Sequence, residues 1–66
     1  MKLSVNGENR DYRGEPTLEA LLRECGAPCE GVAVILNDDV IPRTQRAATH
    51  VREGDRIELV TLAGGG

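Results

Sequence analysis

Residues 3–25 read LSVNGENRDYRGEPTLEALLREC and predict a β-hairpin followed by a single helix. The hairpin begins with Leu3 and Val5, which alternate with polar neighbours at the two-residue period of a half-buried strand. Asn6-Gly7 then predicts a type I′ turn, because that turn needs positive φ at both of its central residues. Residues 8–12 form the returning strand, and their polar side chains indicate an edge of the sheet.

The helix is predicted from Leu18 onward by an apolar stripe at helical spacing. Thr17 is the expected N-cap, or Pro16 and Thr17 share the first turn. Gly26 suits the left-handed position that ends many helices, and Pro28 prevents continuation. The stripe consists of Leu18, Leu21, Leu22 and Cys25, at positions i, i+3, i+4 and i+7.

The remaining strands follow the helix. Residues 32–36 read VAVIL, a continuous apolar run typical of a central strand covered on both faces. Residues 40–41 form a short strand that ends at Pro42, which indicates an edge because proline cannot donate a hydrogen bond to a strand ladder. Residues 43–50 show no clean period and are predicted to be an irregular connection. The last strand spans residues 56–62.

This order of elements predicts an α+β roll, in which a mixed sheet of about five strands packs on one helix. If the last strand lies beside the first, the two must be parallel, because the whole of the intervening chain joins them. That arrangement is the β-grasp layout. We expect residues 1–62 to form this domain and residues 63–66 to extend from it as a flexible C-terminal tail.

The composition is that of one small globular domain. The chain has 66 residues, 29% of them charged and 39% hydrophobic, which is too apolar for a disordered segment. Tyr12 is the only aromatic residue, so the core is predicted to be aliphatic. The net charge is −3 and the eight basic residues are scattered, which argues against nucleic-acid binding. A mildly acidic surface instead suits a basic groove on a protein partner.

The expected compartment is the cytoplasm. No stretch approaches the ~18 apolar residues of a membrane span, and residues 1–6 lack the apolar segment of a signal peptide. Cys25 and Cys29 have a C-x₃-C spacing instead of the C-x₂-C of redox and zinc motifs. A cytoplasmic setting disfavours a disulfide between them, and a zinc site that adds His50 lacks a fourth ligand. We expect no bound metal.

The other polar residues do not predict a catalytic site. His50 has no nucleophilic partner at a suitable spacing and is expected to satisfy a backbone group. Asp38 and Asp39 are interpreted as turn residues, because a carboxylate pair for acid–base chemistry needs a pocket. Arg43 and Arg46 are interpreted as solvated surface residues, with pairing to acidic residues of a partner as the alternative.

The strongest functional signal is at the C-terminus, where residues 60–66 read VTLAGGG. Glycine loses the most backbone entropy on ordering and has no side chain to pack, so this run does not serve folding. Residues 63–66 can extend by about 13–14 Å, far enough to carry the terminal carboxylate into another protein's active site. In the last strand, the core face is predicted to carry Ile57, Leu59 and Thr61. The outer face is charged at its start, with Arg56 and Glu58, and apolar at its end, with Val60 and Leu62. Val60 and Leu62 form a docking patch beside the tail or pack under a neighbouring loop.

Several short motifs occur in the order and spacing of a known family. They are Ile41-Pro42-Arg43, Gln45, His50-Val51, Gly54-Asp55, Ile57 and the closing Gly65-Gly66. With the opening hairpin and the leucine-rich helix, they cover nearly the whole chain, which resembles the ThiS family of sulfur carriers in bacterial thiamine biosynthesis. The resemblance implies a ubiquitin-like β-grasp fold, in agreement with the order of the elements.

The resemblance also implies a protein cosubstrate that is not itself an enzyme and is monomeric when free. A ThiF-like adenylyltransferase would use ATP and Mg²⁺, which this chain does not bind, to convert the carboxylate of Gly66 into an acyl adenylate. A persulfide donor would then supply the sulfur of a thiocarboxylate. A ThiG-like thiazole synthase would use that sulfur to build the thiazole ring of thiamine.

In this family pattern, Gly64 and Gly65 provide clearance behind the reacting carbonyl. The chain departs from the pattern at Ala63-Gly64, where a larger aliphatic residue followed by alanine is expected. Leu62 is therefore the last bulky anchor before the tail, a difference that bears on partner specificity and leaves the chemistry unchanged.

Two other functions remain open. A sibling carrier, such as the small subunit of molybdopterin synthase or a carrier for cysteine synthesis, would use the same tail chemistry, although such carriers are usually longer. A ubiquitin-like modifier would instead form isopeptide bonds to lysines of target proteins. A passive β-grasp binding module would tolerate the loss of Gly65 and Gly66.

Overall fold

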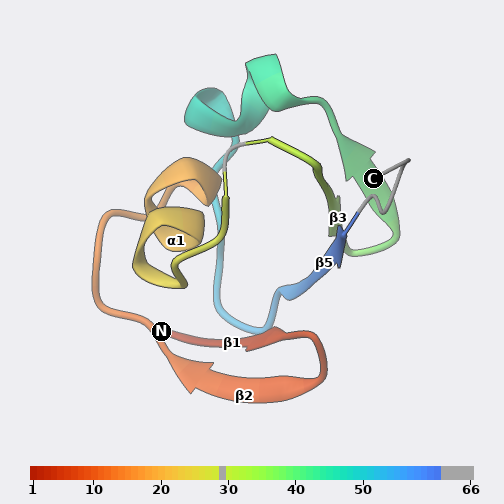
Figure 1. The fold of residues 1–66 in the computed structure, drawn as a ribbon. Coiled ribbons are helices and arrows are strands. Elements are labelled where there is room, and N and C mark those ends of the chain that lie inside the picture. The colour runs from red at the N-terminus through yellow and green to blue at the C-terminus, as the bar shows by residue number, and fades with distance from the viewer. Residues whose placement is uncertain (29, 62–66) are drawn as a thin grey trace.

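The computed structural model describes residues 1–28 and 30–61, which fold into one sheet with a helix packed on it (Figure 1). The elements are β1 Lys2–Val5, β2 Glu8–Asp11, α1 Leu18–Glu24, β3 Val32–Leu36, β4 Asp39–Ile41, the 3₁₀-helix η1 Arg43–Ala48 and β5 Arg56–Thr61. The five strands have the order β2-β1-β5-β3-β4. The predicted α+β fold class is therefore confirmed.

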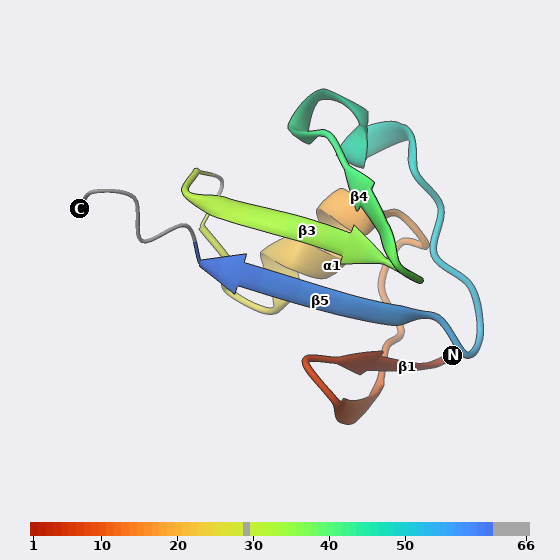
Figure 2. The same ribbon diagram turned by 90° about the vertical axis from the view of Figure 1, so that its right-hand side faces the viewer.

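The first and last strands lie side by side and run parallel, as the β-grasp layout requires. Ser4 pairs with Arg56 and Val5 with Ile57, whereas every other strand pair is antiparallel. Figure 2 shows β5 beside β3, with α1 behind them. The polar strand β2 and the short strand β4 occupy the two edges, also as predicted, and β5 is the middle strand.

The two hairpin turns use residues with positive φ. Asn6 (φ 52°) and Gly7 (φ 82°) form the predicted turn between β1 and β2. Asn37 (φ 49°) and Asp38 (φ 74°) form the turn between β3 and β4. The side-chain oxygens of both asparagines accept hydrogen bonds from backbone N–H groups of β5, at 2.8 and 2.9 Å. These contacts fix both turns against the middle strand.

The ends of α1 agree with the predicted caps. Thr17 is the N-cap, and its Oγ1 accepts a hydrogen bond from the N–H of Ala20 (3.3 Å). Cys25 is the C-cap, and Gly26 follows it with φ 73°. Leu18, Leu21 and Leu22 of the predicted stripe are buried, and Cys25 is half-buried against the core.

The core lies between α1 and the sheet and contains an aromatic ring. The prediction of an aliphatic core is wrong at Tyr12, which is only 1% exposed. Its hydroxyl donates a hydrogen bond to the carbonyl of Glu15 (2.6 Å), so the ring is buried with its polar end satisfied. The buried hydrophobic residues are Leu3, Tyr12, Leu18, Leu21, Leu22, Val32, Val34, Val51 and Ile57.

Residues 43–48 form the 3₁₀-helix η1, where the sequence predicted an irregular connection. The segment has no apolar period because its buried side chain is that of Arg46, which is 8% exposed. Arg46 Nη2 donates to the carbonyl of Val32 (2.8 Å) and so joins η1 to β3. The prediction of a solvated side chain is therefore wrong for Arg46. Arg43, by contrast, is exposed and pairs with Glu30 (3.4 Å).

Candidate functional site

The structure describes the strand that precedes the predicted tail. β5 ends at Thr61, which pairs with Val32 of β3. The tail therefore follows the end of the middle strand. The predicted tail and docking residues that lie outside the described residues are Leu62, Ala63, Gly64, Gly65 and Gly66.

The two faces of β5 have the predicted alternation over most of the strand. Ile57 is buried and Leu59 is half-buried against the core, whereas Glu58 and Val60 are exposed on the other face. Thr61 is on the predicted face, because it pairs with the buried Val32, but its own side chain is exposed at the end of the strand. Val60 is 44% exposed, so it does not pack under a neighbouring loop of the described chain.

Val60 belongs to an apolar patch that three strands build on the face of the sheet opposite α1. It lies opposite Ala33 of β3, and Ile35, two residues further along β3, lies opposite Val40 of β4. Directly opposed residues of antiparallel strands share a face. We define the outer-face patch as Ala33, Ile35, Val40 and Val60.

The outer-face patch corrects the prediction that β3 is covered on both faces. Val32 and Val34 are buried on the helix side, whereas Ala33 and Ile35 are only half-buried. Val40 is 68% exposed. The signal was present in the sequence, because one helix can cover only one face of a sheet. A continuous apolar strand beside that helix must turn its alternate residues outward.

The opposite end of the same face is polar. Arg56, at the start of β5, pairs with Asp38 in the turn between β3 and β4 (3.2 Å). Asp38 is thus a turn residue, as predicted, whereas Asp39 is the first residue of β4. The outer face therefore changes from charged to apolar in the direction of the tail, as the sequence predicted for β5.

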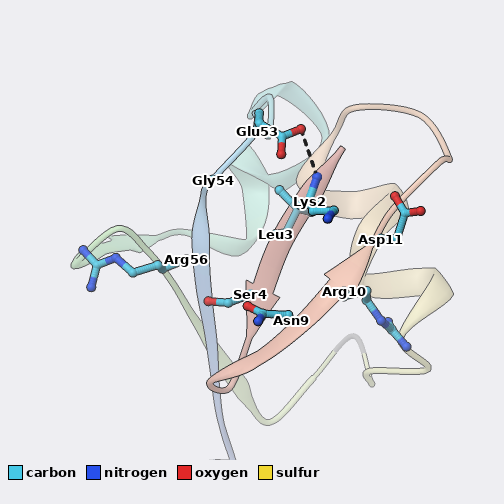
Figure 3. Close-up of a pocket in the computed structure, with 9 residues that line it drawn as sticks. All are labelled: Lys2, Leu3, Ser4, Asn9, Arg10, Asp11, Glu53, Gly54 and Arg56. Atoms are coloured by element: carbon cyan, nitrogen blue, oxygen red, sulfur yellow. Dashed lines mark hydrogen bonds between the residues drawn. The ribbon is translucent and has the colours of Figure 1, made fainter.

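A separate hollow of about 510 Å³ lies between the β1–β2 hairpin and the turn before β5 (Figure 3). The backbone N–H of Lys2 donates to Glu53 Oε1 across it (3.0 Å). Asp11 also lines it, and the hydrogen bond from Arg13 to Asp11 holds the pKa of that carboxyl below its usual value. The charged side chains that line the hollow are of both signs: Lys2, Arg10, Arg56, Asp11 and Glu53.

The remaining candidates do not form a reactive cluster. Arg10 Nη1 donates a hydrogen bond to the sulfur of Cys25, and Cys29 lies outside the described residues. His50 is exposed, and its backbone bridges to Thr17. Within residues 1–28 and 30–61, no three His, Cys, Asp or Glu side chains are grouped to hold a metal ion. Neither helix in that part has the length of an apolar membrane span.

Comparison with known proteins gives the family. The family model described as "ThiS family" matches residues 3–66. The chain belongs to the ThiS family. Among solved structures, the crystal structure of the thiamine biosynthesis protein ThiS from Geobacter metallireducens matches the whole chain over its own whole length, with 36% identity and a TM-score of 0.86. This likeness confirms the ubiquitin-like β-grasp fold of the ThiS-family chain.

Two kinds of curated relatives resemble this ThiS-family chain. The sulfur carrier protein ThiS of Thermus thermophilus is 39% identical over 94% of the chain and 95% of that relative. The thiazole synthase of Paramagnetospirillum magneticum is 42% identical over the whole chain, and that of Magnetococcus marinus is 41% identical. The chain spans about a fifth of the length of these two synthases, 20% in each case.

Proposed function

We propose that this chain is the sulfur carrier for the thiazole ring of thiamine, with Gly66 as the residue that bears the sulfur. The observation that carries the proposal is the match to the Thermus thermophilus sulfur carrier over nearly the full length of both proteins. The family match extends to residue 66 and so includes the three glycines. The chain acts as a protein cosubstrate, and the enzymes that modify it supply the catalytic groups.

Activation is the first step of the proposed chemistry. A C-terminal carboxylate has a reference pKa of about 3.3–3.7, so it is ionised at neutral pH and is a poor electrophile. A ThiF-like adenylyltransferase binds ATP and Mg²⁺ and brings the carboxylate oxygen to the α-phosphate. Pyrophosphate leaves, and the product is an acyl adenylate with AMP as a good leaving group.

Sulfur transfer then proceeds from a persulfide donor. The terminal persulfide sulfur attacks the Gly66 carbonyl carbon, the bond to AMP breaks, and an acyl disulfide forms. A second thiol, from the donor or the enzyme, attacks the donor's cysteine sulfur, which is the sulfur not bonded to the acyl group. The thiocarboxylate leaves, and the second thiol and the donor's cysteine are joined in a new disulfide. The electrons balance, because the S–S bond of the acyl disulfide is exchanged for that of the new disulfide.

The amino-acid sequence of residues 62–66 suits this transfer. Residues 62–66 can extend by about 17 Å from the end of β5, so the reacting carbonyl reaches a site that the globular domain cannot enter. Gly64 and Gly65 have no side chain to crowd the approach to the Gly66 carbonyl. Ala63 adds only a methyl group, and Leu62 is the last large side chain.

The outer-face patch is the proposed docking surface for the adenylyltransferase. It is apolar, it is exposed at Val40 and Val60, and its member Val60 directly precedes Thr61, the last described residue before the tail. Docking there leaves the tail pointed into the partner. The net charge of −3 also favours approach to a basic groove.

The thiazole synthase is the proposed acceptor of the sulfur. Two thiazole synthases contain a segment 41–42% identical to the whole chain. Covalent linkage raises the effective concentration of one partner near the other, so such sequences support a direct transfer between a carrier domain and a synthase. We place the reaction in the cytoplasm, where ATP and thiol donors are available.

Exchange of pyrophosphate into ATP tests the activation step. The adenylyltransferase should catalyse exchange only when the chain is present, because the reverse reaction starts from the acyl adenylate. The matched control is the same chain synthesised with a carboxamide in place of the Gly66 carboxylate. Exchange at the same rate with the carboxamide would overturn the proposal. Conjugates to target lysines, without thiocarboxylate, would indicate a protein modifier instead.

A further inference from the structure

Arg46 is the charged side chain that the described part of the chain buries. Its Nη2 donates to the Val32 carbonyl (2.8 Å), but its Nε is buried without a hydrogen-bond partner there. None of the ion pairs formed by the described residues includes Arg46. Buried charges in proteins are normally paired, because removing a charge from water is costly. Among the described residues, the hydrogen bond from this guanidinium goes to the carbonyl of Val32, and no carboxylate pairs with it.

Arg46 lines a pocket of about 420 Å³ between α1, the turn that follows it and η1. Arg23 of α1 and Arg43 of η1 also line the pocket, and Glu19 is its only carboxylate among the described residues. Three positive charges and one negative charge line this site, and Glu30, which pairs with Arg43, brings the local net charge to +1, in a chain whose net charge is −3. The local field therefore attracts anions, although the chain as a whole does not.

The two outer arginines are free to turn toward a ligand. Arg23 pairs with Glu19 (3.3 Å) and Arg43 pairs with Glu30 (3.4 Å), and all four side chains are more than half exposed. Exposed ion pairs of this kind contribute about 0–1 kcal/mol. A multivalent anion in the pocket can replace them at little cost.

We propose that this arginine pocket binds a tetrahedral oxyanion of the phosphate class. The guanidinium group presents several N–H donors in a planar fork that matches the oxygens of phosphate. Three guanidinium groups around one pocket can contact different oxygens of one anion. The volume exceeds that of phosphate alone, and Leu22, Ala27 and Pro28 provide an apolar wall for an organic substituent.

The pocket also lies close to the end of the sheet that leads to the tail. Arg46 donates to the carbonyl of Val32, and Val32 pairs with Thr61 at the end of β5. A ligand that contacts Arg46 therefore lies two contacts away from Thr61: the hydrogen bond from Arg46 to Val32, and the pairing of Val32 with Thr61. The proposed binding does not depend on the sulfur-carrier function.

Titration of the ¹⁵N-labelled full chain with inorganic phosphate, followed by NMR, tests the proposal. Sodium chloride replaces phosphate at equal ionic strength and pH in the reference titration. We expect saturable shifts in the backbone signals of residues 19–27 and 43–48 and in the Nε–H signal of Arg46. Shifts that grow linearly without saturation, or that chloride reproduces, would overturn the proposal.

Variants distinguish phosphate binding in the arginine pocket from non-specific attraction of phosphate to positive charge. The double variant Arg23→Gln/Arg43→Gln removes two exposed guanidinium groups and should retain the fold. It should weaken phosphate binding by at least about tenfold. Arg13→Gln removes an exposed arginine that pairs with Asp11 and does not line the pocket, so it should bind phosphate as the wild type does. Equal weakening in both variants, or none in the double variant, would contradict the proposed site.

Discussion

Gly14 lies so close to the ring of Tyr12 that a side chain at position 14 would collide with it. A Cβ atom added at Gly14 would lie 2.6 Å from the Tyr12 hydroxyl oxygen and 2.9 Å from the ring carbon that bears it. The ring cannot move aside, because Tyr12 is buried and its hydroxyl is bonded to Glu15. Glycine is needed here for close approach, whereas at Gly7 it serves a positive φ.

Gly14→Ala should lower the free energy of unfolding by about 1–3 kcal/mol, the usual range for overpacking against a buried side chain. In a Tyr12→Phe background the hydroxyl is absent, so the same substitution should cost at least about 0.5 kcal/mol less. Urea denaturation of the four proteins of this cycle measures both values. An unchanged or raised stability of Gly14→Ala would show that the close approach is not required.

Tyr12 should also make the stability depend on alkaline pH. Burial raises the pKa of its phenol above the usual value near 10, and the charges of Glu24 and Glu15 act in the same direction. The unfolded chain therefore loses this proton first. The stabilising contribution is fully present below about pH 10 and is lost as the pH rises through the folded-state pKa.

Thermal unfolding of the wild type and Tyr12→Phe from about pH 9 to about pH 11 measures this effect. The wild type should lose more stability than the variant as the pH rises above about 10. The variant lacks the phenol, so the change of its melting temperature with pH comes only from other titrating groups. Equal slopes in the two proteins would contradict a raised pKa for Tyr12.

At the scale of the elements, local signals predicted the strands and the helix correctly. Asn6-Gly7, Thr17 and Gly26 act on their neighbours in sequence, so their positions indicate where elements begin and end. Two errors arose from contacts that no local period encodes. Tyr12 is buried because its hydroxyl reaches a carbonyl in the next loop. Arg46 is buried because it reaches the carbonyl of Val32, which is 14 residues away.

The candidate site was predicted less completely than the fold. The alternation along β5 identified Val60 as an outer-face residue, because the face of a side chain can be predicted from the pattern of a single strand. Ala33, Ile35 and Val40 could be added only with the strand pairing, which places all three on the face of Val60. The glycines of the predicted tail lie outside the described residues, so their role stays a prediction. The patch is thus a property of three strands together.

Val60→Asp should weaken binding to the adenylyltransferase by about tenfold or more, close to 1.4 kcal/mol, because it places a charge in the outer-face patch. The melting temperature should change little, since Val60 is 44% exposed. Asn9→Asp is the matched control, because it adds the same charge on the exposed edge strand β2. Calorimetric titration measures both affinities. A similar loss in both variants would assign the effect to net charge and contradict docking at the patch.

At the scale of the whole molecule, the described residues form the folded domain, and the proposed chemistry takes place at Gly66, outside it. The buried hydrophobic residues of the core begin at Leu3 and end at Ile57. β5 continues past this core to Thr61 and is held there by pairing with β3. Folding and sulfur transfer should therefore respond to different parts of the chain.

Deletion of Gly65 and Gly66 should abolish carrier activity while changing the free energy of unfolding by no more than about 0.5 kcal/mol. Gly66→Ala is the companion variant, because it keeps the length and adds one methyl group beside the reacting carbonyl. It should be slower than the wild type and faster than the deletion. Thiocarboxylate formation and urea denaturation measure the two properties. A large loss of stability in the deletion would contradict the separation of fold and tail.

The central claim is that Gly66 receives sulfur, and intact-mass spectrometry tests it most directly. The full chain is incubated with ATP, Mg²⁺, the ThiF-like adenylyltransferase and a persulfide donor. We predict a mass gain equal to the replacement of one oxygen atom by one sulfur atom, and fragmentation should assign it to Gly66. An unchanged mass, with an enzyme that activates an authentic ThiS protein under the same conditions, would contradict the sulfur-carrier function.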